Sequence, residues 1–202
     1  AHPNIVKLFK TQQDGSTSYV AMELGDCSLA AAISSVAVGS EYEPVAICKS
    51  VAEGLRHLHA SGFVHGNVTP SNIVMFGPTP KLCGFSCARV VEPTIATKMN
   101  NMRGTPGYQP LEILARKHFA STEVHSPEAI DVFSLGCTMF FIMSGGEEPF
   151  RSAKEARTTE NVELNILSGA SGIEVSSISA EGQHLLPRMF CPGPSDRASL
   201  DN

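Results

Sequence analysis

Apolar side chains recur three or four positions apart between residues 44 and 61, the spacing of one face of an α-helix. The recurring positions are Ile47, Val51, Leu55 and Leu58. Gly62 follows directly, at the usual position of a helix stop. The pattern predicts an amphipathic helix over residues 44–61, whose apolar face packs against other parts of the chain.

Short apolar runs predict strands. Residues 5–9 and 19–22 flank a polar stretch that contains Asp14-Gly15, so they predict an antiparallel hairpin. Three further runs, at residues 63–65, 73–75 and 81–83, are separated by turn-forming Pro, Asn, Ser and Gly. These runs predict short strands carrying loops, and such loops are where functional sites are usually built.

The most apolar stretch, residues 131–143, is apolar on nearly every side of a helix and follows Ser126-Pro127, a good helix start. It predicts a central helix buried by its neighbours. Further helices are predicted at residues 159–167 and 180–190, and Pro187 inside the second is expected to cost about 3 kcal/mol. Residues 92–108 have weak periodicity and predict a long connection. The fold class is therefore α+β, mainly α.

Composition narrows the class of protein. The 202 residues are 42% hydrophobic and 17% charged, which suits one soluble globular domain. A net charge of −5 gives no reason to expect nucleic acid or a membrane surface as partner, and the apolar run at 132–146 is too short to span a bilayer. Six separated cysteines without zinc-ligand spacing favour a reducing, intracellular compartment, cytoplasmic or nuclear. The absence of an initiator Met suggests a piece of a larger protein.

Several short motifs follow one another along the chain: residues 2–6 (HPNIV), 19–24 (YVAMEL), 64–73 (VHGNVTPSNI), 81–86 (KLCGFS), 104–112 (GTPGYQPLE), 130–136 (IDVFSLG) and 194–197 (PSDR). In this order they resemble the motifs of eukaryotic protein kinases of the Ser/Thr type. One short match would be weak, but this many in order and at family-like spacing point to homology.

The resemblance implies how the chain is organised. Residues 1–25 correspond to remnant N-lobe strands and the hinge, and residues 26–202 to the kinase-like C-lobe. Within the C-lobe, it places the catalytic loop at 64–74, the activation segment at 84–112 and the central helix at about 128–144. The glycine-rich loop and the phosphate-binding lysine strand would lie upstream of Ala1.

Positions that perform catalysis in kinases are altered. Asn67 stands where the family has its aspartate base, and a neutral amide cannot accept the substrate's proton. Gly84 stands where the family has its main metal-binding aspartate. Asn72 matches the second metal position but is a poor ligand alone, so a structural role is the preferred interpretation. Gly66 and Thr69 replace two further cations of the family.

For nucleotide contact, the resemblance implies backbone groups of Glu23 and Gly25, Met22 at the rear of the pocket and Val74 beneath the base, with Asn72 nearby. With half of that pocket upstream, ATP binding is expected to be weak and a complete Mg²⁺ site is not expected.

Other matching positions are architectural. The resemblance implies that His65 and Phe85 belong to a hydrophobic column, and that Asp131 anchors the catalytic-loop backbone. It also implies a buried ion pair between Glu112 and Arg197. The scattered histidines, His59 among them, are expected to be ordinary surface or core residues. Thr94, Thr97 and Thr105 fall in the implied activation segment, where the loss of an arginine at Gly66 argues against regulation by phosphorylation.

Three functions are consistent with this pattern. The first is a pseudokinase that binds protein partners, and ATP weakly, without transferring phosphate. The second is an active Ser/Thr kinase that uses unusual residues together with an upstream lobe. The third is a truncated kinase fragment with no function of its own.

Overall fold

The structure is a computed structural model that describes residues 1–35, 43–91, 104–119, 126–151, 158–169 and 178–200. Most of the predicted connection at 92–108 lies outside these ranges, together with Thr94 and Thr97. The described chain is mixed α and β with helices dominating, which confirms the predicted fold class. Within these ranges, no helix combines the length and the apolar character needed to cross a membrane.

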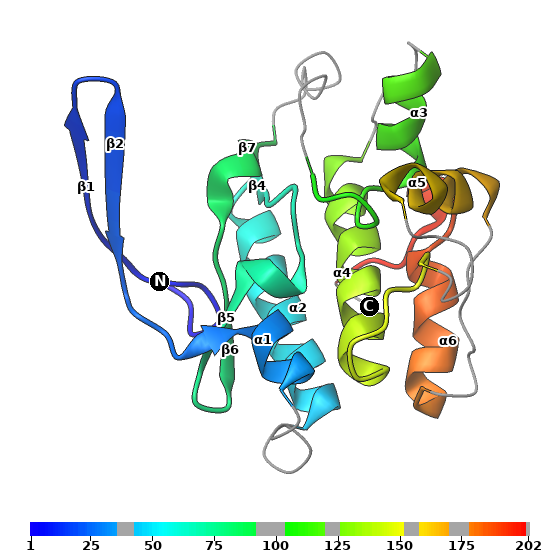
Figure 1. Cartoon of the computed structure of the whole chain (residues 1–202), viewed down its shortest axis with the longest axis horizontal. Coiled ribbons are helices and arrows are strands. Elements are labelled where there is room, and N and C mark those ends of the chain that lie inside the picture. The colour runs from blue at the N-terminus through cyan, green and yellow to red at the C-terminus, as the bar shows by residue number, and fades with distance from the viewer. Residues whose placement is uncertain (36–42, 92–103, 120–125, 152–157, 170–177, 201–202) are drawn as a thin grey trace.

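A two-stranded hairpin, β1 (Leu8–Asp14) and β2 (Thr17–Met22), extends away from the rest of the molecule (Figure 1). The predicted antiparallel hairpin is confirmed, but its first strand, predicted at residues 5–9, begins at Leu8 and ends at Asp14. Ile5 instead forms a parallel bridge with Leu82, and β1 runs through the polar residues up to Asp14. Every side chain of the hairpin is exposed, so backbone pairing and not apolar alternation sets its bounds.

Two small sheets lie where the chain was predicted to form short strands carrying loops. One has the order β3 (Cys27–Ser28), β5 (Ile73–Phe76), β6 (Thr79–Leu82), and the other pairs β4 (Phe63–Val64) with β7 (Arg89–Val90). β6 begins two residues earlier than predicted. Phe76 pairs with Thr79, so the turn contains only Gly77 and Pro78, and the strand resumes at once.

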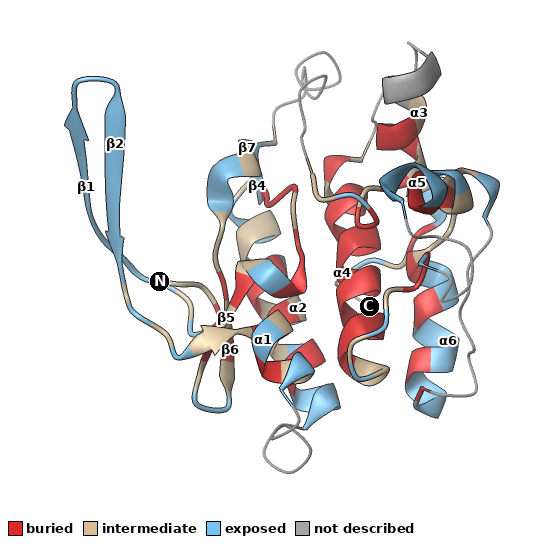
Figure 2. Ribbon diagram, in the orientation of Figure 1, coloured by how far each residue is buried: buried red, intermediate tan, exposed pale blue. Residues whose placement is uncertain are grey.

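The helical part is built around α4 (Pro127–Met143), which is buried over almost its whole length (Figure 2). α2 (Pro44–Ala60) packs against α4 and β6 with the face that contains Ile47, Val51 and Leu55. α1 (Leu29–Ser34) is capped by Ser28, whose Oγ accepts a hydrogen bond from Ala31 N. For the two long helices, α2 and α4, apolar patterning predicted the C-terminal end to within one residue.

Three further helices cover the other side of α4: α3 (Leu111–Phe119), α5 (Thr159–Ser168) and α6 (Ala180–Met189). A second apolar cluster joins them, in which the Phe133 ring stacks on Phe150 at 5.5 Å and Phe190 meets both rings edge-on. Pro187 lies inside α6, as the sequence indicated, and the helix continues past it to Met189.

Candidate functional site

The loop that follows β4 is fixed to the core by one buried carboxylate. Asp131, on α4, has no exposed side-chain surface. Its Oδ2 accepts a hydrogen bond from His65 N at 2.7 Å, and its Oδ1 accepts one from Gly66 N at 2.7 Å. Gly66 has φ +74°, a conformation that glycine adopts without strain. Because a buried carboxylate requires such donors, these two hydrogen bonds hold the start of the loop against α4.

His59 is a third partner of Asp131, with Nε2 2.8 Å from Oδ2. No sequence pattern indicated this contact, because His59 belongs to the last turn of α2 and lies 72 residues from its partner. Its role is to join α2 to α4 beneath the loop.

His65 is fully buried and its ring lies against Phe85, with centroids 4.9 Å apart. Nδ1 accepts a hydrogen bond from Asn67 N at 3.3 Å, so the proton is on Nε2, which donates to Cys83 O at 2.8 Å. Burial lowers the pKa of His65, against smaller opposing effects of Asp131 and the Cys83 carbonyl. The ring is therefore neutral at neutral pH and joins the two loops.

This shift predicts a loss of stability in mild acid. The unfolded chain takes up a proton at His65 near the ordinary pKa of 6.5, whereas the folded chain takes it up only at lower pH. The contribution of the buried, neutral His65 to the free energy of unfolding is therefore complete above about pH 6.5 and falls as the pH drops further. Urea unfolding from pH 7 to pH 5 should show a weaker pH dependence for His65→Phe than for the parent chain. The exposed His184→Gln variant should keep the parent's slope, and equal slopes for parent and His65→Phe would contradict this assignment.

Asn67 is held on both sides. Its side-chain Oδ1 accepts hydrogen bonds from Thr105 N at 3.0 Å and Thr105 Oγ1 at 2.9 Å, and its main-chain oxygen accepts one from Asn72 Nδ2 at 3.0 Å. The structure thus brings together three residues singled out in the sequence. The amide oxygen of Asn67 accepts hydrogen bonds but is not a base. Nearby, Thr69 is buried, and its carbonyl accepts a hydrogen bond from Asn72 N.

Gly84 has the left-handed conformation, φ +74° and ψ 43°, and lies against the side chain of Asn72. A Cβ added at Gly84 would overlap Asn72 Oδ1 and lie 2.6 Å from Asn72 Cγ. Asn72 therefore fills the space in which an aspartate side chain would begin.

These residues do not fit the Mg²⁺ ion that the family resemblance implies. Of the two candidate metal positions, Gly84 has no side chain and Asn72 offers a neutral amide whose Nδ2 is bound to Asn67 O. Mg²⁺ in nucleotide sites is held by carboxylates together with phosphates. In the described part of the chain, no group of three or more His, Cys, Asp and Glu side chains could hold a metal ion.

The candidate nucleotide residues lie near the base of the hairpin. Met22 ends β2 and is 47% exposed. Glu23 N donates to Lys7 O at 3.0 Å. Gly25 lies directly on β5, because a Cβ added there would overlap Val74 Cγ1 and lie 2.9 Å from Met75 O. The predicted hinge and the predicted floor of the pocket are thus in contact with each other.

An ion pair that no sequence pattern indicated holds this region together. Lys81 Nζ lies 2.8 Å from both carboxylate oxygens of Glu23 and 4.3 Å from the centre of the Phe76 ring. The hydrogen bond from Lys81, followed by that from Lys7 N, lowers the pKa of Glu23. The pair ties the segment after β2 to β6.

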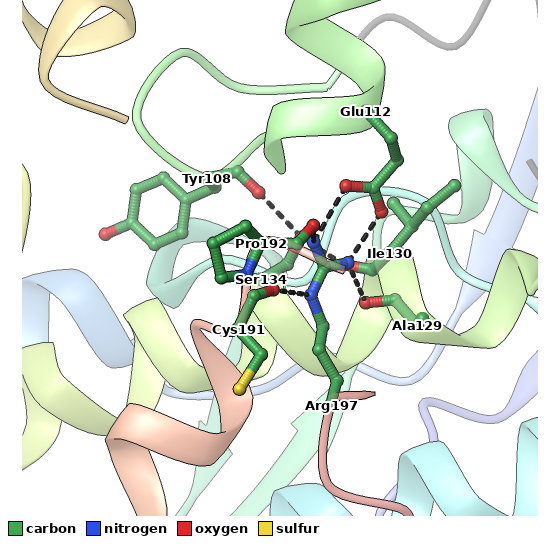
Figure 3. Close-up of polar contacts among 8 residues, drawn as sticks. All are labelled: Tyr108, Glu112, Ala129, Ile130, Ser134, Cys191, Pro192 and Arg197. Carbon is green, nitrogen blue, oxygen red and sulfur yellow. Dashed lines mark hydrogen bonds and ion pairs between the residues drawn. The ribbon is translucent and has the colours of Figure 1, made fainter. Parts of the chain in front are cut away.

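Arg197 and Glu112 form a buried ion pair that connects the C-terminal segment to α3 (Figure 3). Arg197 donates to the two oxygens of Glu112 at 2.6 and 2.7 Å. Its other donors go to the main-chain oxygens of Ala129, Cys191 and Pro192. All five N–H groups of the guanidinium are therefore used.

These features define a mixed α/β lobe of the protein-kinase type. The family model described as protein kinase domain matches residues 1–202, the whole chain. The chain therefore belongs to the protein kinase family.

Curated relatives support the same class. The chain is 27% identical to the human serine/threonine-protein kinase/endoribonuclease IRE2, over 98% of the chain and 22% of that protein. It is 28% identical to the serine/threonine-protein kinase cds1 of Schizosaccharomyces pombe, over 98% of the chain and 43% of that protein. A probable serine/threonine-protein kinase of Dictyostelium discoideum, irlD, is 26% identical over 82% of the chain and 10% of that protein. The chain thus spans less than half the length of these relatives and resembles Ser/Thr kinases.

Proposed function

We propose that this chain is the C-lobe of a pseudokinase, with residues 1–25 as hinge and N-lobe remnant, which binds protein partners and does not transfer phosphate at an enzymatic rate. The observation behind the proposal is the pair Asn67 and Gly84. Phosphoryl transfer needs a carboxylate near the substrate hydroxyl and a carboxylate on the metal, and neither position has one. The packing of Asn72 against Gly84 supports it, because it fills the space of the missing side chain.

A phosphate-transfer assay tests the proposal. Losing a general base typically costs about 10²–10⁴-fold in rate, and the missing metal ligand adds to this cost. The full-length protein with radiolabelled ATP, Mg²⁺ and a protein substrate should give no transfer above background. The Asn72→Ala variant, as the matched control, should give the same background. Robust transfer that Asn72→Ala abolishes would overturn the proposal.

The second candidate is an active Ser/Thr kinase with unusual site residues. It is favoured by the hydrogen bonds that join Asn67, Asn72 and Thr105, because they keep the loop ordered around the reaction position. Calorimetry of ATP binding with and without Mg²⁺ separates the two candidates. A pseudokinase should bind ATP weakly and independently of Mg²⁺, because Gly84 offers no side chain to hold the metal. A large Mg²⁺ effect would favour the active enzyme.

The hairpin has an exposed apolar surface. Five large apolar side chains on or beside it are between 51% and 94% exposed: Leu8, Phe9, Tyr19, Val20 and Leu24. Exposed apolar groups of this kind are typical of a surface that another protein segment covers. The six cysteines are thiols and not disulfides, in keeping with the proposed cytoplasmic or nuclear location.

A further inference from the structure

A cavity of about 370 Å³ lies among α4, α5 and α6, away from the loops of the candidate site. Its size is within the range of small-molecule sites. Apolar side chains from all three helices form most of the wall, including Phe133 on α4, Ile166 on α5 and Leu186 on α6. In Figure 1 these helices lie together, on the side of the molecule opposite the hairpin.

Among the described residues, the polar side chains that line this cavity have hydrogen-bond partners in the protein. Arg197 reaches the wall, but its five N–H groups are used by Glu112 and three main-chain oxygens. Gln183 Nε2 donates to Ile178 O at 3.0 Å, and Ser168 Oγ donates to Asn165 O at 3.2 Å. Gln183 Nε2 keeps one further N–H, so an anion placed here would gain at most one donor from these groups while losing its hydration.

We propose that this cavity binds a neutral, apolar small molecule, alkyl or aryl, through its fit to the apolar wall. An apolar cavity of about 150 Å³ holds one benzene molecule, so this volume would accommodate about fifteen carbon atoms. The proposal concerns a surface that the phosphate-transfer residues do not touch, and it is independent of whether the chain is a pseudokinase.

The position of the cavity gives binding a structural consequence. Leu111, which precedes Glu112 at the start of α3, lines the cavity together with Arg197. A bound ligand therefore contacts segments on both sides of the buried ion pair. Because such a ligand binds only the folded state, it raises the free energy of unfolding of the chain.

Two probes with one aromatic framework test the chemistry. N-phenyl-1-naphthylamine is neutral, and 1-anilinonaphthalene-8-sulfonate adds a negative charge to the same rings. The full chain should bind the neutral probe saturably at one site, with a rise in fluorescence. The sulfonate should bind at least about tenfold more weakly, since at most one N–H donor would offset the lost hydration of its charge. Equal or tighter binding of the sulfonate would overturn the proposal.

Matched variants on α5 locate the site. Ile166→Phe narrows the cavity and should weaken binding of the neutral probe by about tenfold or more. Leu164→Phe changes an exposed residue of the same helix and should bind as the parent does. Unchanged binding by a folded Ile166→Phe variant would place the probe elsewhere and overturn the proposal.

A measurement on the unsubstituted chain keeps the test valid if Ile166→Phe does not fold. Intermolecular NOEs should connect the ring protons of the neutral probe to the methyl groups of Ile166 and Leu186. NOEs restricted to hairpin methyl groups, such as those of Leu8 and Val20, would show binding to the exposed apolar surface and overturn the proposal.

Discussion

Replacing Arg197 by methionine should lower the free energy of unfolding by about 3–5 kcal/mol, the usual cost of removing one partner of a buried ion pair. The side chains of Arg197 and Glu112 are only 1% and 6% exposed. Without the guanidinium, the Glu112 carboxylate loses two charge-assisted hydrogen bonds in a region that water does not reach freely. Three main-chain oxygens lose a donor at the same time.

Urea unfolding followed by circular dichroism measures this loss, and the chain supplies its own control. Arg151 pairs with Glu148 at the surface, where the side chains are 52% and 28% exposed. Arg151→Met should therefore cost less than about 1 kcal/mol. In the Arg197→Met background, Glu112→Gln should recover part of the loss, because it removes the buried charge. If Arg197→Met cost no more than Arg151→Met, the ion pair would not have the structural role assigned to it.

The parts of the fold that the sequence predicted well depend on local patterns. The helix at residues 44–61 was found because its apolar side chains follow the period of a helix, and the buried helix around 131–143 because it is apolar on nearly every side and follows Ser126-Pro127. The observed helices, Pro44–Ala60 and Pro127–Met143, agree closely. The pairing of Glu112 with Arg197 was indicated by motif resemblance and not by any periodicity. The structure brings these two residues together across 85 positions.

The parts that the sequence did not predict depend on contacts between distant segments. The position of β1 follows from pairing with β2, since an exposed strand has no apolar alternation to mark its ends. Similarly, His59 reaches Asp131, and Lys81 reaches Glu23, only once α2 and β6 are packed in place. No residue spacing could have indicated these partners, because charged and imidazole side chains of this kind are common on surfaces.

Restoring an aspartate at position 84 should destabilise the chain by about 2–4 kcal/mol without restoring phosphate transfer. One part of the cost is the left-handed backbone, φ +74°, which disfavours any residue with a Cβ. The other part is the overlap of that Cβ with Asn72, whose side chain is held by its hydrogen bond to Asn67 O. Phosphate transfer should stay absent, because Asn67 still cannot accept a proton.

Two further variants separate the parts of this cost. Gly62 has φ +79° and nothing within 4 Å of an added Cβ, so Gly62→Asp measures the backbone part, about 1–2 kcal/mol. Asn72→Ala in the Gly84→Asp background removes the overlap, so the double variant should be more stable than the sum of the single losses by about 1 kcal/mol. Urea unfolding of the parent chain, Gly84→Asp, Asn72→Ala and the double variant gives this coupling free energy. Simple additivity, or a Gly84→Asp cost equal to that of Gly62→Asp, would show that Asn72 does not fill the position of the missing carboxylate.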